Sequence, residues 1–216
     1  VYPPDRLRTV AAVLQPSPGR DIVLTTDAIV AGVHFLSDDP AAAIAQKALR
    51  VNISDLAAKG ATPRVYLLTL AMPSTIGESW LKSFAAGLKR DQTRFAISLV
   101  GGDTVATHGP LTIGITAIGE VPRGKMLTRG GAQAGDDIWV TGTIGDAALG
   151  LKVARGGDLH LSEKHRAAAL ARFRIPEPRL ELGIGLVGAA HACLDVSDGL
   201  IADLGHLSDV SGVGIE

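Results

Sequence analysis

The sequence predicts a mixed α/β fold in which strands and helices alternate along the chain. Apolar runs of strand length, such as VYLLTLA at 65–71, are followed by stretches with helical spacing of apolar residues, such as 77–90. Hydrophobic residues make up 46% of the chain and charged residues 20%, which is ordinary for a globular protein. Its 216 residues suffice for one good-sized core, or for one domain and part of a second.

The chain is expected to open with strands and then a long helix. Residues 21–26 (DIVLTT) form an apolar run that ends in polar residues, and a second short strand is expected over 29–35. The helical pattern covers 41–59. Pro40 is favourable just before its start, and Gly60 is a plausible stop.

The middle of the chain continues this alternation. Residues 65–71 are expected to form a buried strand, and the spacing of apolar residues predicts an amphipathic helix over 77–90. Further apolar runs predict strands over 96–100 and 111–121. Together these segments predict an N-terminal domain with a sheet and two long helices.

The remaining segments resemble the beginning of a second, unfinished domain. Strands are expected over 137–141 and 192–196, and helices over 145–154, 163–173, 179–190 and 200–210. Pro176 and Pro178 cannot continue a helix, so a boundary belongs within 142–178. We divide the chain into domains at 1–141 and 142–216, and expect the second to be an incomplete α/β domain.

Composition argues against several classes of function. The net charge is −1 and Lys and Arg do not cluster, so neither nucleic acid nor an anionic membrane is an expected partner. No apolar stretch approaches the roughly 18 residues that a membrane span needs. A single cysteine, Cys193, allows no internal disulfide, and the start VYPPDRLR lacks both a signal-peptide pattern and an initiator Met. We therefore expect a cytoplasmic protein.

Four polar clusters follow apolar strands or close apolar helices, and each joins a carboxylate to a hydroxyl or a small residue. They are Thr25-Thr26-Asp27, Asn52-Ile53-Ser54-Asp55, Gly101-Gly102-Asp103-Thr104 and Asp195-Val196-Ser197-Asp198-Gly199. Mg²⁺ prefers oxygen ligands and usually binds through a few carboxylates and substrate phosphates. Glycine beside a carboxylate lets the backbone approach a phosphate closely. Taken singly, each cluster also fits a turn or a helix cap.

Other signatures of nucleotide binding or hydrolysis are missing. The sequence holds neither a GxxxxGK[ST] loop nor a GxGxxG after a strand, and no GxSxG elbow. Gly142–Asp146 reads best as a tight strand-to-helix turn. His34 in GVHF is, by itself, more typical of a packed or surface residue than of a ligand.

Taken in order, the clusters resemble the thiamine-monophosphate kinases of the aminoimidazole-ribonucleotide-synthetase-like (PurM-like) ATP-binding superfamily. The matching segments are LTTDAIVAGVHF (24–35), KALRVNISDLAAKGATP (47–63), LVGGDT (99–104), LTRGGAQAGD (127–136), VTGTIGDAALGL (140–151) and LDVSDGLIADLGH (194–206). The first two together are specific for these kinases, whereas DVSDGL is shared more widely within the superfamily.

The resemblance implies a PurM-like N-terminal domain that binds ATP and magnesium and forms a homodimer through its sheets. It implies transfer of the ATP γ-phosphoryl group to thiamine monophosphate, by direct in-line attack without a catalytic side-chain base. The implied magnesium ligands are Thr25, Thr26, Asp27, Asp55, Asp103, Asp195 and Asp198. The implied ATP residues are Gly102, Asp103, Arg129 and Ser197, and His34 is the implied contact to thiamine monophosphate.

Two departures from the family pattern stand out. The family carries a GIGDDAA-like segment before its first strand, and this sequence has Thr9-Val10 where the two metal-binding aspartates stand. Either the pair is absent, or a segment is missing between Arg8 and Thr9. The family also extends beyond Glu216, where its remaining substrate residues are expected. The alternatives are another ATP-dependent synthetase of the superfamily, or a nucleotide-binding protein without catalysis.

Overall fold

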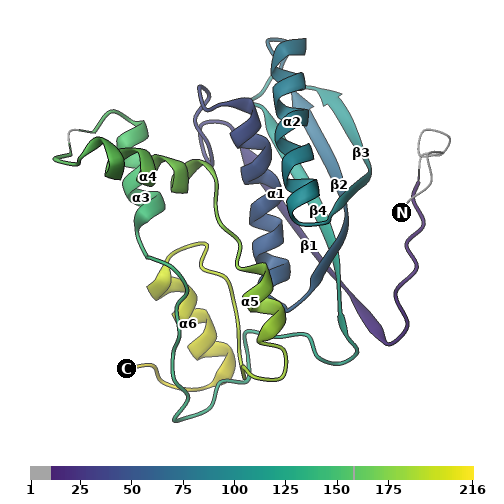
Figure 1. Cartoon of the computed structure of the whole chain (residues 1–216), viewed down its shortest axis with the longest axis vertical. Coiled ribbons are helices and arrows are strands. Elements are labelled where there is room, and N and C mark those ends of the chain that lie inside the picture. Colours follow the sequence, from purple (N-terminus) through teal and green to yellow (C-terminus); the bar gives the residue numbers. More distant parts are fainter. Residues whose placement is uncertain (1–10, 158) are drawn as a thin grey trace.

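The computed structural model describes residues 11–157 and 159–216, so the expected Asp-Asp position at Thr9-Val10 lies outside the described part. The elements are β1 (Arg20–Val30), α1 (Ala41–Ala58), β2 (Thr62–Met72), α2 (Glu78–Arg94), β3 (Ser98–Ala106), β4 (Thr112–Pro122), α3 (Asp146–Ala154), α4 (Glu163–Arg174), α5 (Leu180–Gly185) and α6 (Leu200–Ser211). Strands and helices alternate up to β3, β4 follows β3 directly, and the described elements after β4 are all helices (Figure 1).

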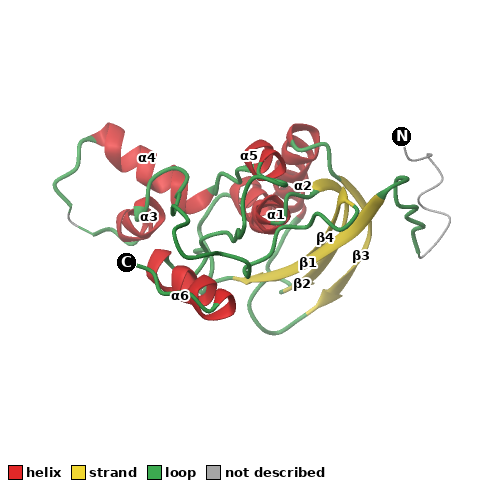
Figure 2. Ribbon diagram, turned by 90° about the horizontal axis from the view of Figure 1, so that it is seen from below, coloured by secondary structure: helices red, strands yellow, loops and turns green. Residues whose placement is uncertain are grey.

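The four strands form one mixed sheet in the order β1-β4-β2-β3. β4 pairs antiparallel with both β1 and β2, while β2 and β3 are parallel. Helices α1 and α2 lie together on one face of the sheet, and no described helix covers the other face (Figure 2). The strand order makes β1 and β3 the two edges of the sheet. The expected mixed α/β fold is confirmed.

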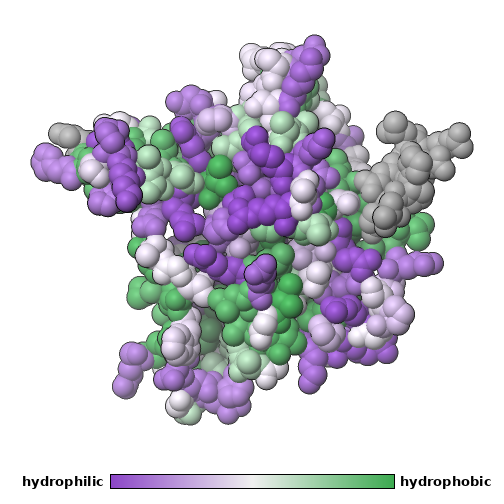
Figure 3. All heavy atoms as spheres, in the orientation of Figure 1, coloured by the Kyte–Doolittle hydropathy of each residue, from purple (hydrophilic) through white to green (hydrophobic). Residues whose placement is uncertain are grey.

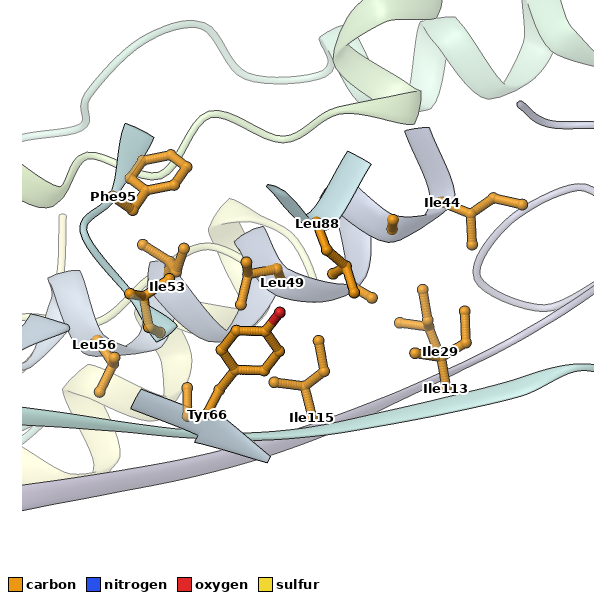
Figure 4. Packing of buried hydrophobic residues seen from close by; sticks show 14 of the residues in the cluster. Ile29, Ile44, Leu49, Ile53, Leu56, Tyr66, Leu88, Phe95, Ile113 and Ile115 are labelled. Atoms are coloured by element: carbon orange, nitrogen blue, oxygen red, sulfur yellow. The ribbon is translucent and has the colours of Figure 1, made fainter. Parts of the chain in front are cut away.

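The core fills the space between the sheet and α1 and α2. Leu49 and Ile53 of α1 are 0% exposed and pack against Tyr66 of β2 and Ile115 of β4 (Figure 4). Burying side chains of this size stabilises the fold by about 1.5–3 kcal/mol each. The hydroxyl of Tyr66 has no hydrogen-bond partner, and burial raises its pKa. Tyr66 therefore contributes to this core through the packing of its ring and not through a hydrogen bond.

Four sequence predictions are wrong in their detail. No separate strand covers 29–35, because β1 ends at Val30 and the amides of Val33 and His34 turn back to the Val30 carbonyl. The segments 137–141 and 192–196, expected to be strands, form no strand. The expected helix at 179–190 shortens to α5, which has six residues. Apolar runs alone do not make strands, since a strand also needs a neighbour to accept its backbone hydrogen bonds.

The last residues of α4 and the loop after it are tied to the first part of the chain by charge. The Arg174 Nε donates to Asp39 at 2.6 Å, and the Lys47 ammonium lies 4.0 Å from the centre of the Phe173 ring. Glu177 accepts from both Arg50 and Arg94. Figure 3 shows hydrophilic residues around this junction of α1, α2 and α4.

Helix α5 docks directly on α1, although it lies on the C-terminal side of the expected boundary at 141/142. A Cβ on Gly183 would sit 2.0 Å from the carbonyl oxygen of Ala57, so the two backbones meet at a position that only glycine fits. Leu180 and Val187 pack against the main core. None of the described helices is both long and apolar enough to cross a membrane.

Candidate active site

Strand β1 presents two of the predicted residues to the helix layer. Because side chains alternate along a strand, Thr25 and Asp27 face α1 while Thr26 faces the uncovered side of the sheet. The Thr25 hydroxyl donates to Oδ2 of Asp55, on the last turn of α1, at 2.5 Å. Thr26 instead donates to the Ile115 carbonyl within the sheet.

Asp27 and Asp55 form the centre of the site. Their carboxyl groups lie within hydrogen-bonding range of each other, and burial together with the charge of Asp55 raises the pKa of Asp27. The backbone amide of Asp27 donates to Oδ1 of Asn52 at 3.1 Å. Asn52 is itself fully buried and donates to the Ala48 carbonyl. The shared helix face of Asn52 and Asp55 thus fixes β1 to α1 at this point.

The loop before α6 adds a third carboxylate. Asp195 accepts a hydrogen bond from the Ser54 hydroxyl, and burial together with the charge of Asp55 raises its pKa. Carboxylates from β1, α1 and a distant loop therefore share one region, in which burial first and the charge of Asp55 second disfavour the charged forms of Asp27 and Asp195. Hydroxyl and carboxylate oxygens of this kind fit a hard cation such as Mg²⁺.

Lys59, which sequence reasoning missed, directly follows α1 and supplies a positive charge beside these carboxylates. Burial lowers its pKa and so does the nearby Arg129, whereas Cys193, Asp195 and Asp55 raise it. Its own carbonyl accepts from the Leu127 amide at 3.2 Å, which brings the loop of Arg129 to the end of α1. No motif in the sequence marked this lysine, because its role depends on the loops that fold back over it.

His34 lies in the turn after β1 and is exposed. Its Nδ1 accepts a hydrogen bond from the Val30 amide at 3.0 Å, so the neutral ring carries its proton on Nε2. The Lys47 ammonium donates to the His34 carbonyl at 2.7 Å. His34 is also close enough to Asp27 for its charge to lower the pKa of that carboxyl. The structure thus places this predicted substrate residue beside the carboxylates.

Ser197 and Asp198 are exposed at the start of α6, and sequence reasoning missed the residue that holds them. The buried Asp203, one turn into α6, accepts hydrogen bonds from the amides of Ser197, Asp198 and Gly199. An aspartate four residues after a helix-opening glycine is the signal that could have identified it. The Arg129 carbonyl, in turn, accepts from Ser211 at the end of α6.

Asp103 and Gly102 lie far from the other predicted residues. β4 and β2 separate their strand from β1, a distance of about 14 Å at the usual strand spacing. Asp103 pairs with the exposed Thr69, so it faces the uncovered side of the sheet. Gly102 has φ +150°, and a Cβ there would lie 1.8 Å from the Leu68 carbonyl oxygen. Within 11–157 and 159–216, no three His, Cys, Asp or Glu side chains group closely enough to hold one metal ion.

Comparison with known proteins gives consistent matches. The family model described as AIR synthase related protein, N-terminal domain, matches residues 9–121. The thiamine-monophosphate kinase of Caulobacter vibrioides is 47% identical over 202 residues, which cover 94% of this chain and 56% of that protein. This chain thus spans little more than half the length of that relative.

Two solved structures share the fold. The crystal structure of thiamine-monophosphate kinase from Stenotrophomonas maltophilia aligns with a TM-score of 0.85 and 43% identity, over 94% of this chain and 64% of that one. AaThiL complexed with AMPPCP and TMP aligns with a TM-score of 0.85 and 32% identity, over 92% and 63%. Both are chains to which this protein is similar along most of its own length.

Proposed function

Because the chain belongs to the AIR synthase related family through its N-terminal domain, we propose that the full-length protein is an ATP- and Mg²⁺-dependent kinase of thiamine monophosphate. The observation that carries this proposal is the meeting of Asp27, Asp55 and Asp195 from three separate parts of the chain. The names of its relatives support the substrate, since the curated proteins are thiamine-monophosphate kinases and one similar structure holds AMPPCP and TMP.

Mg²⁺ fits the oxygen-rich region around Asp55. Asp27, Asp55 and Asp195 would hold the ions with Thr25, and Asp198 would add a ligand from the loop before α6. Thr26 faces the other side of the sheet and is left out of this set. Bound ions neutralise the charge of the transferring phosphoryl group and of both phosphorylated substrates. Because Mg²⁺ keeps waters and takes substrate phosphates as ligands, a cage made of protein groups alone is not required. Burial and the charge of Asp55 raise the pKa values of Asp27 and Asp195, and a bound cation would favour the charged form of both carboxylates.

The chain's own groups can bind and orient both substrates. Arg129 and Ser197 would contact ATP, and Lys59 adds a cation beside them. The Nε2–H of His34 would donate to thiamine monophosphate. An oxygen of the substrate phosphate forms the new bond to the γ-phosphorus as the bond from that phosphorus to the β-phosphate oxygen breaks, and ADP leaves. The attacking oxygen is already anionic, so no side chain needs to remove a proton.

We also propose that the site is completed in a homodimer, which would give Asp103 and Gly102 a place in it. Both belong to the sheet edge opposite Asp27, and Asp103 faces the uncovered side. That side exposes Leu24, Leu67 and Val105 at 64%, 39% and 46%. Packing of two such faces would bury apolar surface and bring the β3 edge of one copy towards the β1 edge of the other.

The test is formation of thiamine diphosphate by the full-length protein from thiamine monophosphate, ATP and Mg²⁺, followed by chromatography. We expect product from the wild-type protein and at least about a hundredfold lower turnover from Asp55→Asn, because Asp55 lies between two other carboxylates. The exposed Asp38→Asn is the control and should keep wild-type turnover. Absence of product from folded wild-type protein would refute the kinase, and full activity of Asp55→Asn would remove this residue from the site.

A further inference from the structure

One oxygen of Asp203 satisfies three consecutive backbone amides. Its Oδ2 accepts from the amides of Ser197 at 2.9 Å, Asp198 at 3.1 Å and Gly199 at 3.2 Å. Asp203 is 5% exposed and is the one buried residue of α6. The other residues of α6 are half-buried or exposed, so burial of this carboxylate does not follow from burial of its helix.

Three successive amides that point at one place form an anion-binding concavity, and the positive end of the helix dipole adds to it. In a site for ATP, such a turn would be expected to bind a phosphate oxygen through its amides. Here the protein's own carboxylate takes all three. The turn therefore keeps only its side-chain oxygens and carbonyls for ligands.

Simple capping of α6 does not explain this arrangement. The N-cap residue is Gly199, which has no side chain, and Asp203 lies one turn inside the helix. Its bonds extend back to Ser197, two residues before the N-cap, and so they fix the turn rather than the helix end. Gly199, with φ +126°, lets the chain bend so that all three amides converge.

The fixed turn controls where its neighbours point. With the amides of 197–199 turned inwards, the side chains of Ser197 and Asp198 are left exposed. Asp195, two residues earlier, meets Ser54 on α1. A free turn would let these oxygens sample many directions, and ordering them when ligands bind would cost affinity.

We propose that Asp203 is a positioning residue for Mg·ATP: by holding the amides of 197–199, it presents the oxygens of Ser197 and Asp198 to the metal and nucleotide. This inference rests on the proposed kinase function. It predicts that nucleotide is bound at this turn through side chains and metal, and not through the amides before α6.

The test compares Asp203→Asn and Asp203→Ala with the wild-type full-length protein. Asn keeps one acceptor but loses the charge, so we expect a roughly tenfold higher KM for Mg·ATP, and a larger rise for Ala. The KM for thiamine monophosphate should stay within about twofold, because His34 belongs to another element. A general loss of structure would instead raise both KM values or lower only the amount of active enzyme. The exposed Asp209→Asn on the same helix is the matched control.

A second measurement does not depend on activity. Residue-resolved amide hydrogen exchange of the wild-type protein should show protection at Ser197, Asp198 and Gly199, and Asp203→Asn should lower it there while leaving α1 unchanged. Wild-type KM for Mg·ATP in both folded variants, or unprotected amides in the wild-type protein, would overturn the proposal. If the wild-type protein lacks kinase activity but these amides are protected, the proposed kinase function is refuted. The role of Asp203 in holding the turn would then still stand.

Discussion

At the scale of single residues, Lys47 combines a half-buried charge with three contacts. Its ammonium donates to the His34 carbonyl, lies over Phe173 and interacts with Asp39. Burial lowers its pKa to about 8, while the charge of Asp39 raises it. A lysine so placed holds the turn of His34 but makes the protonated form costly in the folded protein.

Lys47 therefore makes a predictable contribution to stability as the pH rises. Between its folded pKa of about 8 and the ordinary value of 10.5, the unfolded chain binds more protons than the folded chain, so stability rises with pH. We expect the free energy of unfolding of the wild type to gain on that of Lys47→Met from pH 8 to pH 10, measured with urea. The exposed Lys82→Met, as control, should run parallel to the wild type. A parallel curve for Lys47→Met would contradict the assignment.

Three carboxylates of the candidate site were named from the sequence, whereas the residues that hold or accompany them were not. Asp27, Asp55 and Asp195 stand in short polar clusters that end apolar runs, and the fold brings these three together. Lys59 and Asp203 stand in ordinary helical sequence, and their roles come from loops that approach them from elsewhere. A residue whose role is set by distant backbone leaves no local pattern to read.

At the scale of elements, apolar periodicity predicted the helices and paired strands between 41 and 122 well, because each of these elements packs a face against the same core. It predicted strands wrongly at 137–141 and 192–196. Trp139 is 86% exposed there, and the Cys193 amide bonds to the Thr128 carbonyl rather than to a strand. A run of β-forming residues shows that a strand could form, whereas the pairing depends on a neighbour that sequence alone does not supply.

The pairing of β2 with β3 depends on Gly102, which the resemblance links to ATP. Gly102 has a φ of +150°, and a Cβ there would lie 1.8 Å from the Leu68 carbonyl oxygen. The backbone of the strand pair therefore requires glycine at this position. We expect Gly102→Ala to lower the free energy of unfolding by about 2 kcal/mol or more, since backbone on both strands would have to move. Gly101→Ala is the control, because its Cβ would meet only the flexible Leu67 side chain at 3.2 Å. If urea unfolding shows equal losses of free energy for the two variants, the close approach of the Leu68 carbonyl is not the reason why position 102 needs glycine.

At the scale of the whole molecule, one chain does not unite the predicted site. Asp27 lies on edge strand β1 facing the helices, and Asp103 lies on edge strand β3 facing the other way. The sheet would have to close on itself or meet a second sheet for both to reach one phosphate group. The exposed apolar residues of the uncovered face favour the second arrangement, in which each copy completes the site of the other.

Mixing two inactive variants tests this arrangement directly. If Asp27 of one copy works with Asp103 of the other, Asp27→Asn and Asp103→Asn should each be inactive, yet a mixed dimer of the two holds one intact site out of two. Half of the dimers in an equal co-expression are mixed, so we expect about a quarter of wild-type thiamine diphosphate formation. The matched control pairs Asp27→Asn with Asp55→Asn, which lie in one site of a single chain; every site then keeps a damaged residue and activity stays lost. Mixing without recovery, in dimers verified by mass, would show that Asp103 does not act across the interface.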